Sequence, residues 1–131
     1  MRTLTLLIAL TVFAGWTLAA DLAGTYKGTW SSDDEGSGDL TLIFSAGDSG
    51  TIQAQVSFTT NEGAAVKCDV KSATVQGSKV ELLLDYEVNG NRYETTASGT
   101  LDGKTLSGTY KTKALTGDSP GGSGTWKTTA V

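Results

Sequence analysis

The most informative segment for the architecture runs from Val80 to Tyr110 and reads VELLLDYEVNGNRYETTASGTLDGKTLSGTY. Asn89-Gly90 and Asp102-Gly103 divide it into three runs of residues that favour strands. Both dipeptides are typical of the two-residue hairpin turn of type I′, which needs positive φ at both central positions. Residues alternate in character along the first run, with only Leu83 out of phase. The stretch therefore predicts an antiparallel meander.

The same alternation continues on both sides of the meander. Apolar residues recur at every second position in runs near 40–44, 52–58 and 66–70, and Tyr26, Gly28 and Trp30 share one face of a run over 23–31. Residues 124–128 are predicted as the last strand. The parity slips after Lys71-Ser72, because Ala73 and Val75 are apolar out of phase, and a β-bulge there would explain the slip. About eight short strands with no long crossover predict an all-β, antiparallel up-and-down barrel.

Related Gly-Thr-aromatic phrases stand in the first and last of these runs, at 24–30 and 124–127, and again at 108–111. We interpret the first and last runs as the strands that meet to close the barrel, with glycine allowing the sharp coil and the aromatic ring filling the interior. The alternative is that such phrases are simply good starts for a strand.

Four motifs carry a family resemblance: Gly-x-Tyr-x-Gly-x-Trp at 24–30, Leu-x-Leu-x-Phe at 40–44, Val-x-Gly-x-x-Val at 75–80, and Gly-x-Leu-Asp-Gly-x-x-Leu-Ser-Gly-Thr-Tyr at 99–110. Over nearly all of Leu22 to Thr128 the chain resembles the small lipocalin-like barrel domains of exported bacterial proteins, whose functions are mostly unassigned. It is also similar to avidins, although the polar biotin ligands of avidins find no counterparts here. The resemblance implies a secreted bacterial barrel and assigns no site residues.

The first twenty residues have the layout of a secretory signal peptide. Arg2 is a short basic start, residues 4–13 are apolar, and residues 17–20 are small enough for cleavage after Ala19 or Ala20. The alternative is an amino-terminal membrane anchor, for which the apolar run is short. We therefore expect a signal peptide over residues 1–20, a barrel domain over 21–131, and a secreted or periplasmic protein.

Charge and parity argue against two classes of partner. Cleavage would remove one basic residue and no acid, so the net charge would fall from −4 to −5. An acidic domain is a poor partner for nucleic acid or for anionic lipid surfaces. Apolar side chains are expected inside and polar ones outside, which is the reverse of an outer-membrane barrel. The chain is thus predicted to be a soluble barrel that binds neither nucleic acid nor membrane.

The residues for catalysis are largely missing. The chain has no histidine, and its single cysteine, Cys68, shares the inward parity of Val66 and Val70, so we expect a buried, inert thiol. Five carboxylates fall on the outward parity, where they would be solvated and spread apart: Asp69, Glu81, Asp85, Glu87 and Glu94. We predict a protein that is not an enzyme, with no catalytic residue and no cofactor; a small hydrolase would need two of these acids close together in a cleft.

An acidic loop follows the first strand, and its residues faintly resemble the start of a calcium loop: Asp33, Asp34, Glu35, Ser37 and Asp39. The twelfth position of such a loop would be Phe44, which cannot bind calcium through a carboxylate. We interpret the segment as a solvated hairpin loop and predict no metal site.

Six aromatic residues on inward positions are the candidate ligand-binding residues: Tyr26, Trp30, Tyr86, Tyr93, Tyr110 and Trp126. Small residues, Thr95, Ala97, Gly99 and Gly108, are predicted beside them. A barrel of about eight strands has an interior that side chains can fill or that can hold one small ligand, and both alternatives stay open. Tyrosine hydroxyls and indole N–H groups would supply the polarity, which favours a small hydrophobic or aromatic guest.

The first hypothesis for function is therefore a secreted barrel that binds a small hydrophobic ligand. The second is a structural or protein-interaction module that uses its outer surface and holds no ligand. Ile43 and Leu83 interrupt the outward polar pattern, so a homo-oligomer that uses them is a further hypothesis.

Overall fold

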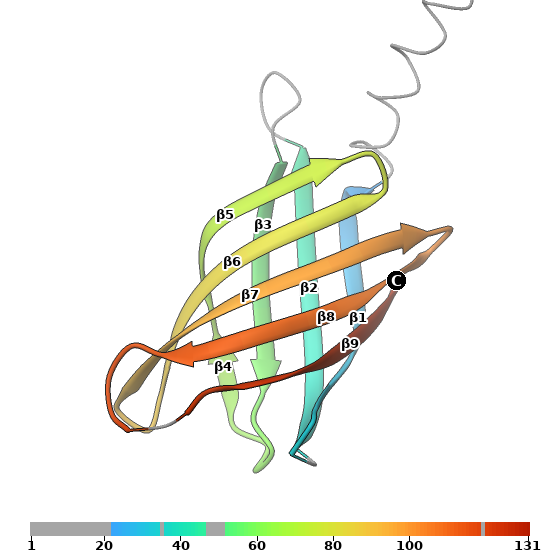
Figure 1. Cartoon of the computed structure of the whole chain (residues 1–131). Coiled ribbons are helices and arrows are strands. Elements are labelled where there is room, and N and C mark those ends of the chain that lie inside the picture. Colours follow the sequence, from blue (N-terminus) through green and yellow to red (C-terminus); the bar gives the residue numbers. More distant parts are fainter. Residues whose placement is uncertain (1–21, 35, 47–51, 119) are drawn as a thin grey trace, which may run out of the picture.

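The computed structural model describes residues 22–34, 36–46, 52–118 and 120–131. The predicted signal peptide lies outside these residues. The described chain forms nine strands (Figure 1): β1 (Gly24–Ser32), β2 (Ser37–Ala46), β3 (Ile52–Thr59), β4 (Ala65–Lys67), β5 (Asp69–Gln76), β6 (Lys79–Val88), β7 (Asn91–Asp102), β8 (Thr105–Ala114) and β9 (Gly122–Ala130). Among the described residues, no helix is long and apolar enough to cross a membrane.

All nine strands belong to one antiparallel sheet of order β4-β3-β2-β1-β9-β8-β7-β6-β5, which curls into a nearly closed up-and-down barrel (Figure 1). The first and last long strands pair as predicted, and Trp30 on β1 lies opposite Trp126 on β9. At the other junction, β4 pairs with β3 and β5 pairs with β6. The two edge strands of the sheet, β4 and β5, are thus consecutive halves of one bent segment of the chain.

This bent segment explains why nine strands replace the predicted eight. The fourth predicted strand breaks at Cys68, whose N–H donates a hydrogen bond to the Val56 carbonyl on β3 at 2.9 Å. The predicted bulge is confirmed, because the register of β5 against β6 shifts between Val70 and Ser72. The extra residue returns the apolar side chains of the second half of the segment to the inner face.

The two meander turns differ from each other. Asn89 and Gly90 have φ of 53° and 82°, so the predicted type I′ turn is confirmed. At the second turn the prediction was wrong by one residue, because Asp102 pairs with Thr105 and the central residues are Gly103 and Lys104. Only the glycine has positive φ, 62°, as in a type II′ turn, where glycine occupies the first central position.

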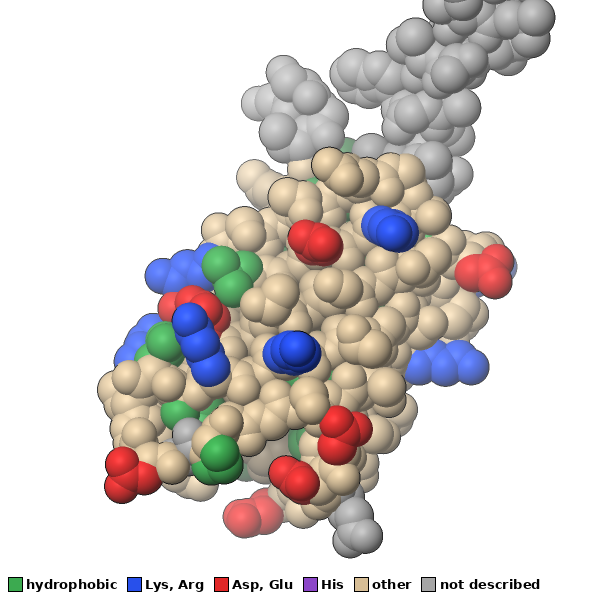
Figure 2. Space-filling model, viewed as in Figure 1, with side chains coloured by type: hydrophobic (Ala, Val, Ile, Leu, Met, Phe, Trp, Pro, Cys, Tyr) green, Lys and Arg blue, Asp and Glu red, His purple; other side chains and the backbone are tan. Residues whose placement is uncertain are grey.

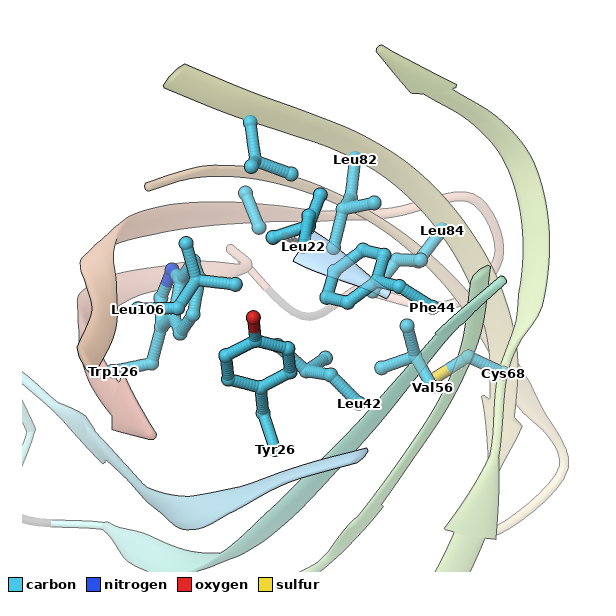
Figure 3. Close-up of a cluster of buried hydrophobic side chains, with 12 residues drawn as sticks. Leu22, Tyr26, Leu42, Phe44, Val56, Cys68, Leu82, Leu84, Leu106 and Trp126 are labelled. Atoms are coloured by element: carbon cyan, nitrogen blue, oxygen red, sulfur yellow. The ribbon is translucent and has the colours of Figure 1, made fainter. Parts of the chain in front are cut away.

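One end of the barrel is packed with side chains. Tyr26 and Phe44 meet edge to face there, with ring centroids 5.7 Å apart, and Leu22, Val80 and Leu106 are at most 1% exposed. Figure 3 shows labelled core side chains pointing inward from the surrounding strands. Thr128 is also buried in this core, and its hydroxyl donates to the Leu106 carbonyl at 2.8 Å. The filled-interior alternative therefore holds at this end.

Candidate functional site

The other end of the barrel is hollow. A cavity of about 320 Å³ lies inside the turns that join β1 to β2, β3 to β4, β6 to β7 and β8 to β9. Its wall is built from inward residues of these strands, and Asn61 of the β3–β4 turn and Ser123 at the start of β9 lie at its rim. The volume falls at the lower end of the range for small-molecule sites. The sequence left a filled core and a pocket open as alternatives, and the barrel contains both, at opposite ends.

Five of the six predicted aromatic residues line this cavity: Trp30, Tyr86, Tyr93, Tyr110 and Trp126. Tyr26 does not line it, because it lies in the packed end and is 2% exposed. It shares the inward parity of Trp30 but stands four residues earlier on β1, which separates the two by about 13 Å along an extended strand. Parity assigns a side chain to the interior without giving its depth.

Five of the aromatic residues that line the cavity form a continuous series of ring contacts. Trp30 meets Tyr110 and Phe58 edge to face, with centroids 6.5 and 6.2 Å apart. Phe58 meets Tyr86 at 5.0 Å, and Tyr86 stacks on Tyr93 at 5.8 Å with an angle of 26° between the rings. We call this series the aromatic arc. Phe58 was not among the predicted ligand-binding residues, although its inward parity on β3 was the signal that could have found it.

Glycines make room for both tryptophans. A Cβ atom on Gly99 would lie 2.5 Å from Cζ2 of Trp126, and one on Gly38 would lie 2.6 Å from Nε1 of Trp30. These distances are shorter than any normal contact, so each indole lies against a bare backbone. The predicted placement of Gly99 beside an aromatic ring is thereby confirmed.

The source of cavity polarity differs from the prediction for the indole N–H groups and not for the Tyr86 hydroxyl. The indole N–H of Trp30 donates to the Thr59 carbonyl at 2.8 Å, and that of Trp126 donates to the Thr109 carbonyl at 3.1 Å. The Tyr110 hydroxyl donates to the Ser31 carbonyl at 3.3 Å. The prediction that indole N–H groups would serve a guest was wrong, because strand carbonyls already occupy these donors.

A chain of three hydroxyl groups supplies polarity instead. The Tyr86 hydroxyl and Thr95 Oγ1 are 2.8 Å apart, and Thr95 Oγ1 and Thr112 Oγ1 are 2.7 Å apart. All three residues line the cavity, and Thr95 is 7% exposed. We call this feature the hydroxyl chain. The sequence analysis predicted Thr95 only as a small residue beside the aromatic side chains. The three oxygens come together only because β6 pairs with β7 and β7 pairs with β8.

The cavity wall carries no formal charge. None of the residues that line it is Asp, Glu, Lys or Arg. Burial raises the pKa of Tyr110 to about 12, with smaller contributions from Tyr86 and Asp33, so this phenol stays protonated at neutral pH. The interior therefore offers apolar surface, aromatic faces and hydroxyls, and it offers no counter-ion to a charged guest.

Hydrogen bonds fasten the rim turns to one another. The Asp33 N–H donates to the Ser123 carbonyl at 2.9 Å, and the Ser123 hydroxyl donates to Asp33 Oδ2 at 2.8 Å. The Ser37 N–H donates to Asn61 Oδ1 at 3.3 Å. The acidic loop thus helps to tie three turns together. Glu35 lies outside the described residues, and within them no group of three or more Asp, Glu, Cys or His could hold a metal ion.

One predicted solvated carboxylate is in fact buried. Asp85 on β6 has the outward parity but is only 5% exposed, because Lys71 and Arg92 lie beside it with their nitrogens 3.4 and 4.0 Å from Oδ2. Its Oδ1 has no hydrogen-bond partner. Glu94 is paired with Lys113 at 3.2 Å. Asp69 and Glu94 lie directly opposite Asp85 on β5 and β7, so the prediction that the acids are spread apart was wrong for these three. The face in Figure 2 carries both acidic and basic side chains.

Cys68 lies in the core at the bend between β4 and β5, and it is 7% exposed, as predicted. Burial raises the pKa of its thiol to about 12, and the neighbouring charge of Asp69 adds to the effect. Ile43 is 40% exposed on β2, whereas Leu83 is half-buried on β6. Because β3 and the bent β4–β5 segment lie between them around the barrel, these two residues do not form one patch.

Comparison with known proteins identifies the fold. No protein-family model matches the chain, and no curated protein matches it. A solved structure described as EF1p2_mFAP2b bound to DFHBI is similar to it, with a TM-score of 0.72 and 14% sequence identity. The similarity covers 88% of this chain and 98% of that one. At this identity the likeness shows the fold alone, so the chain is an all-β antiparallel barrel.

Proposed function

We propose that this protein binds one small, uncharged, hydrophobic or aromatic molecule in the open end of its barrel. The observation that carries the proposal is the 320 Å³ cavity bounded by the aromatic arc, without a charged side chain in its wall. A guest there would exchange water for apolar surface and ring contacts. An ionised guest would lose its hydration without gaining a counter-ion, which is costly.

The structural counterpart supports the same proposal. EF1p2_mFAP2b is a barrel of similar fold, and it was solved with DFHBI, a small aromatic dye. The sequence identity is too low to transfer any contact residue between the two chains. The complex of the counterpart with DFHBI supports the proposal of a small aromatic guest for this barrel.

We further propose that the protein is exported and has no enzymatic activity. Export rests on the basic, apolar and small segments of residues 1–20. The proposal of no catalysis rests on the absence of histidine from the sequence and on the cavity wall, which lacks an acid or a base. Amino-terminal sequencing of the protein recovered from outside the cytoplasm should begin at Ala20 or Asp21; an intact Met1 there would contradict cleavage.

The binding proposal can be tested with PRODAN, a neutral naphthalene dye whose emission shifts to the blue in apolar surroundings. We expect saturable binding of one dye per chain. Ala97 lines the cavity and is 7% exposed, so Ala97→Phe should fill the space and abolish binding, and Ala97→Leu should weaken it. Thr96 is the next residue on β7 and is exposed, so Thr96→Phe is the matched control and should leave binding unchanged.

Circular dichroism should show that all three variants remain folded. Equal dye affinity in Ala97→Phe and the parent protein would place the dye outside the cavity and refute the proposal. Native mass spectrometry of protein purified from its own host gives an independent measurement, because an adduct that leaves on denaturation would be the natural guest.

A further inference from the structure

We propose that the hydroxyl chain makes the cavity selective for guests with a neutral hydrogen-bond acceptor, that is, for flat aromatic carbonyl compounds over aromatic hydrocarbons of the same shape. This inference rests on the proposed function, since it concerns the same cavity. It names a chemical class that the shape of the cavity alone does not provide.

The first step is the position of the hydroxyl chain. Thr95 on β7 pairs with Leu84 on β6 and with Thr112 on β8, and Tyr86 comes two residues after Leu84 on the same face. The oxygen distances of 2.8 and 2.7 Å make the three hydroxyls one connected unit. Ala97, two residues along β7, is the apolar neighbour of the unit in the cavity wall.

The second step is a count of protons. A hydroxyl group donates one hydrogen bond and can accept two. Three hydroxyls carry three protons, and the two bonds between them use two, whichever way the chain is oriented. One proton therefore remains, on Tyr86, Thr95 or Thr112 according to the orientation, and all three of these residues line the cavity.

The third step is what a guest does to that proton. A guest that fills the cavity excludes water from the hydroxyls, and a buried donor without an acceptor is unfavourable. An aromatic hydrocarbon leaves the proton unpaired, and a guest that only donates leaves it unpaired as well. A carbonyl oxygen accepts it. A carboxylate would accept it too, but the cavity wall has no cation to neutralise the charge.

The test uses 9-fluorenone and fluorene, which share a three-ring skeleton and differ by a carbonyl against a methylene group. Their affinities are measured by displacement of PRODAN. We expect fluorenone to bind roughly tenfold more tightly, a ratio that corresponds to about 1.4 kcal/mol. In the triple variant Tyr86→Phe, Thr95→Val, Thr112→Val, which removes all three hydroxyls, the ratio should fall to near one.

A matched control lies in the same cavity. Tyr110 is also a tyrosine of the wall, but its hydroxyl is bound to the Ser31 carbonyl and does not belong to the hydroxyl chain. Tyr110→Phe should therefore keep the tenfold ratio. Because each comparison is a ratio of two guests within one variant, a general change in cavity size cancels to first order.

The outcomes separate this inference from the proposed function. Equal affinity of the two compounds in the parent protein, or a ratio that survives in the triple variant, would overturn the inference while leaving a binding barrel intact. Failure of both compounds and of PRODAN to bind would remove the binding function and the inference together.

One measurement does not depend on any variant folding. The infrared carbonyl stretch of fluorenone bound to the parent protein should lie at lower frequency than in a hydrocarbon solvent, because hydrogen bonding weakens the bond. A carbonyl band at the hydrocarbon frequency would overturn the inference.

Discussion

Gly99→Ala should destabilise the barrel mainly through a contact with the Trp126 side chain, with a lesser contact to the Ser107 carbonyl oxygen at 3.2 Å. The added Cβ would lie 2.5 Å from Cζ2 and 2.6 Å from Cη2 of the indole. An ordinary carbon contact is at least about 3.5 Å, so the ring must move by about 1 Å. Such a movement would also lengthen the 3.1 Å hydrogen bond from the indole to Thr109. The substitution thus perturbs the wall of the cavity and the core at once.

The expected size combines two opposing effects. Overpacking of this kind costs about 1–3 kcal/mol. Replacement of glycine by alanine at a strand position without positive φ recovers about 0.4–1 kcal/mol by restricting the unfolded chain. The free energy of unfolding should therefore fall by roughly 0.5–2 kcal/mol, and the Tm by about 2–8 °C for a domain of this size.

A double-mutant cycle provides the assay. Phenylalanine at position 126 has a shorter ring that does not reach the two indole positions in contact with Gly99. In a Trp126→Phe background, Gly99→Ala should therefore cost much less, because only the 3.2 Å contact with the Ser107 carbonyl oxygen remains. Urea denaturation followed by far-ultraviolet circular dichroism measures all four proteins. The same loss in both backgrounds would refute the assigned contact.

Four further predictions concern single sites. Gly90→Val should cost about 1–3 kcal/mol, because φ at this position is 82° and a β-branched residue tolerates it poorly; Gly122→Val, which also faces open space but has no positive φ, is the control, and equal melting temperatures would contradict the turn. Trp126→Ala should cost about 3–5 kcal/mol, since the indole is only 5% exposed, and a change below 1 kcal/mol in urea denaturation would argue that it is not core. Cys68 should resist iodoacetamide at pH 8 until the protein is unfolded, because its thiol pKa is raised to about 12; rapid alkylation of the native protein would show that the site opens. Absorbance at 295 nm should show one tyrosine titrating near pH 12, and this titration should be missing in Tyr110→Phe. Because the folded pKa of Tyr110 lies above its unfolded value, its contribution to stability is complete below about pH 10 and is lost as the pH rises to 12.

Much of the fold can be predicted from local sequence patterns. Alternation with a period of two places side chains on one face or the other, and the slip after Lys71 locates a bulge that the register confirms. Asn89-Gly90 determines its own turn, because few other pairs accept positive φ at both positions. The matching phrases in the first and last strands correctly predict that β1 pairs with β9.

The sequence rules failed where the outcome depends on residues of a neighbouring strand. Asp102-Gly103 allows two turn registers, and the pairing of β7 with β8 selects the one centred on Gly103 and Lys104. Asp85 is outward by parity, yet the long side chains of Lys71 and Arg92 cover it. No local pattern in the sequence reports such coverage.

The antiparallel barrel and the inward direction of its large aromatic residues can be derived from the order of amino acids, because steric preferences at each position set the pleat and the turns. Which interior positions are filled and which are hollow depends on how the curled sheet packs. Tyr26 and Trp30 have the same parity, but they lie at different depths, one in the packed end and one beside the cavity. The hydroxyl chain likewise depends on distances across three strands, and such distances exist only when the sheet has curled and its registers are set.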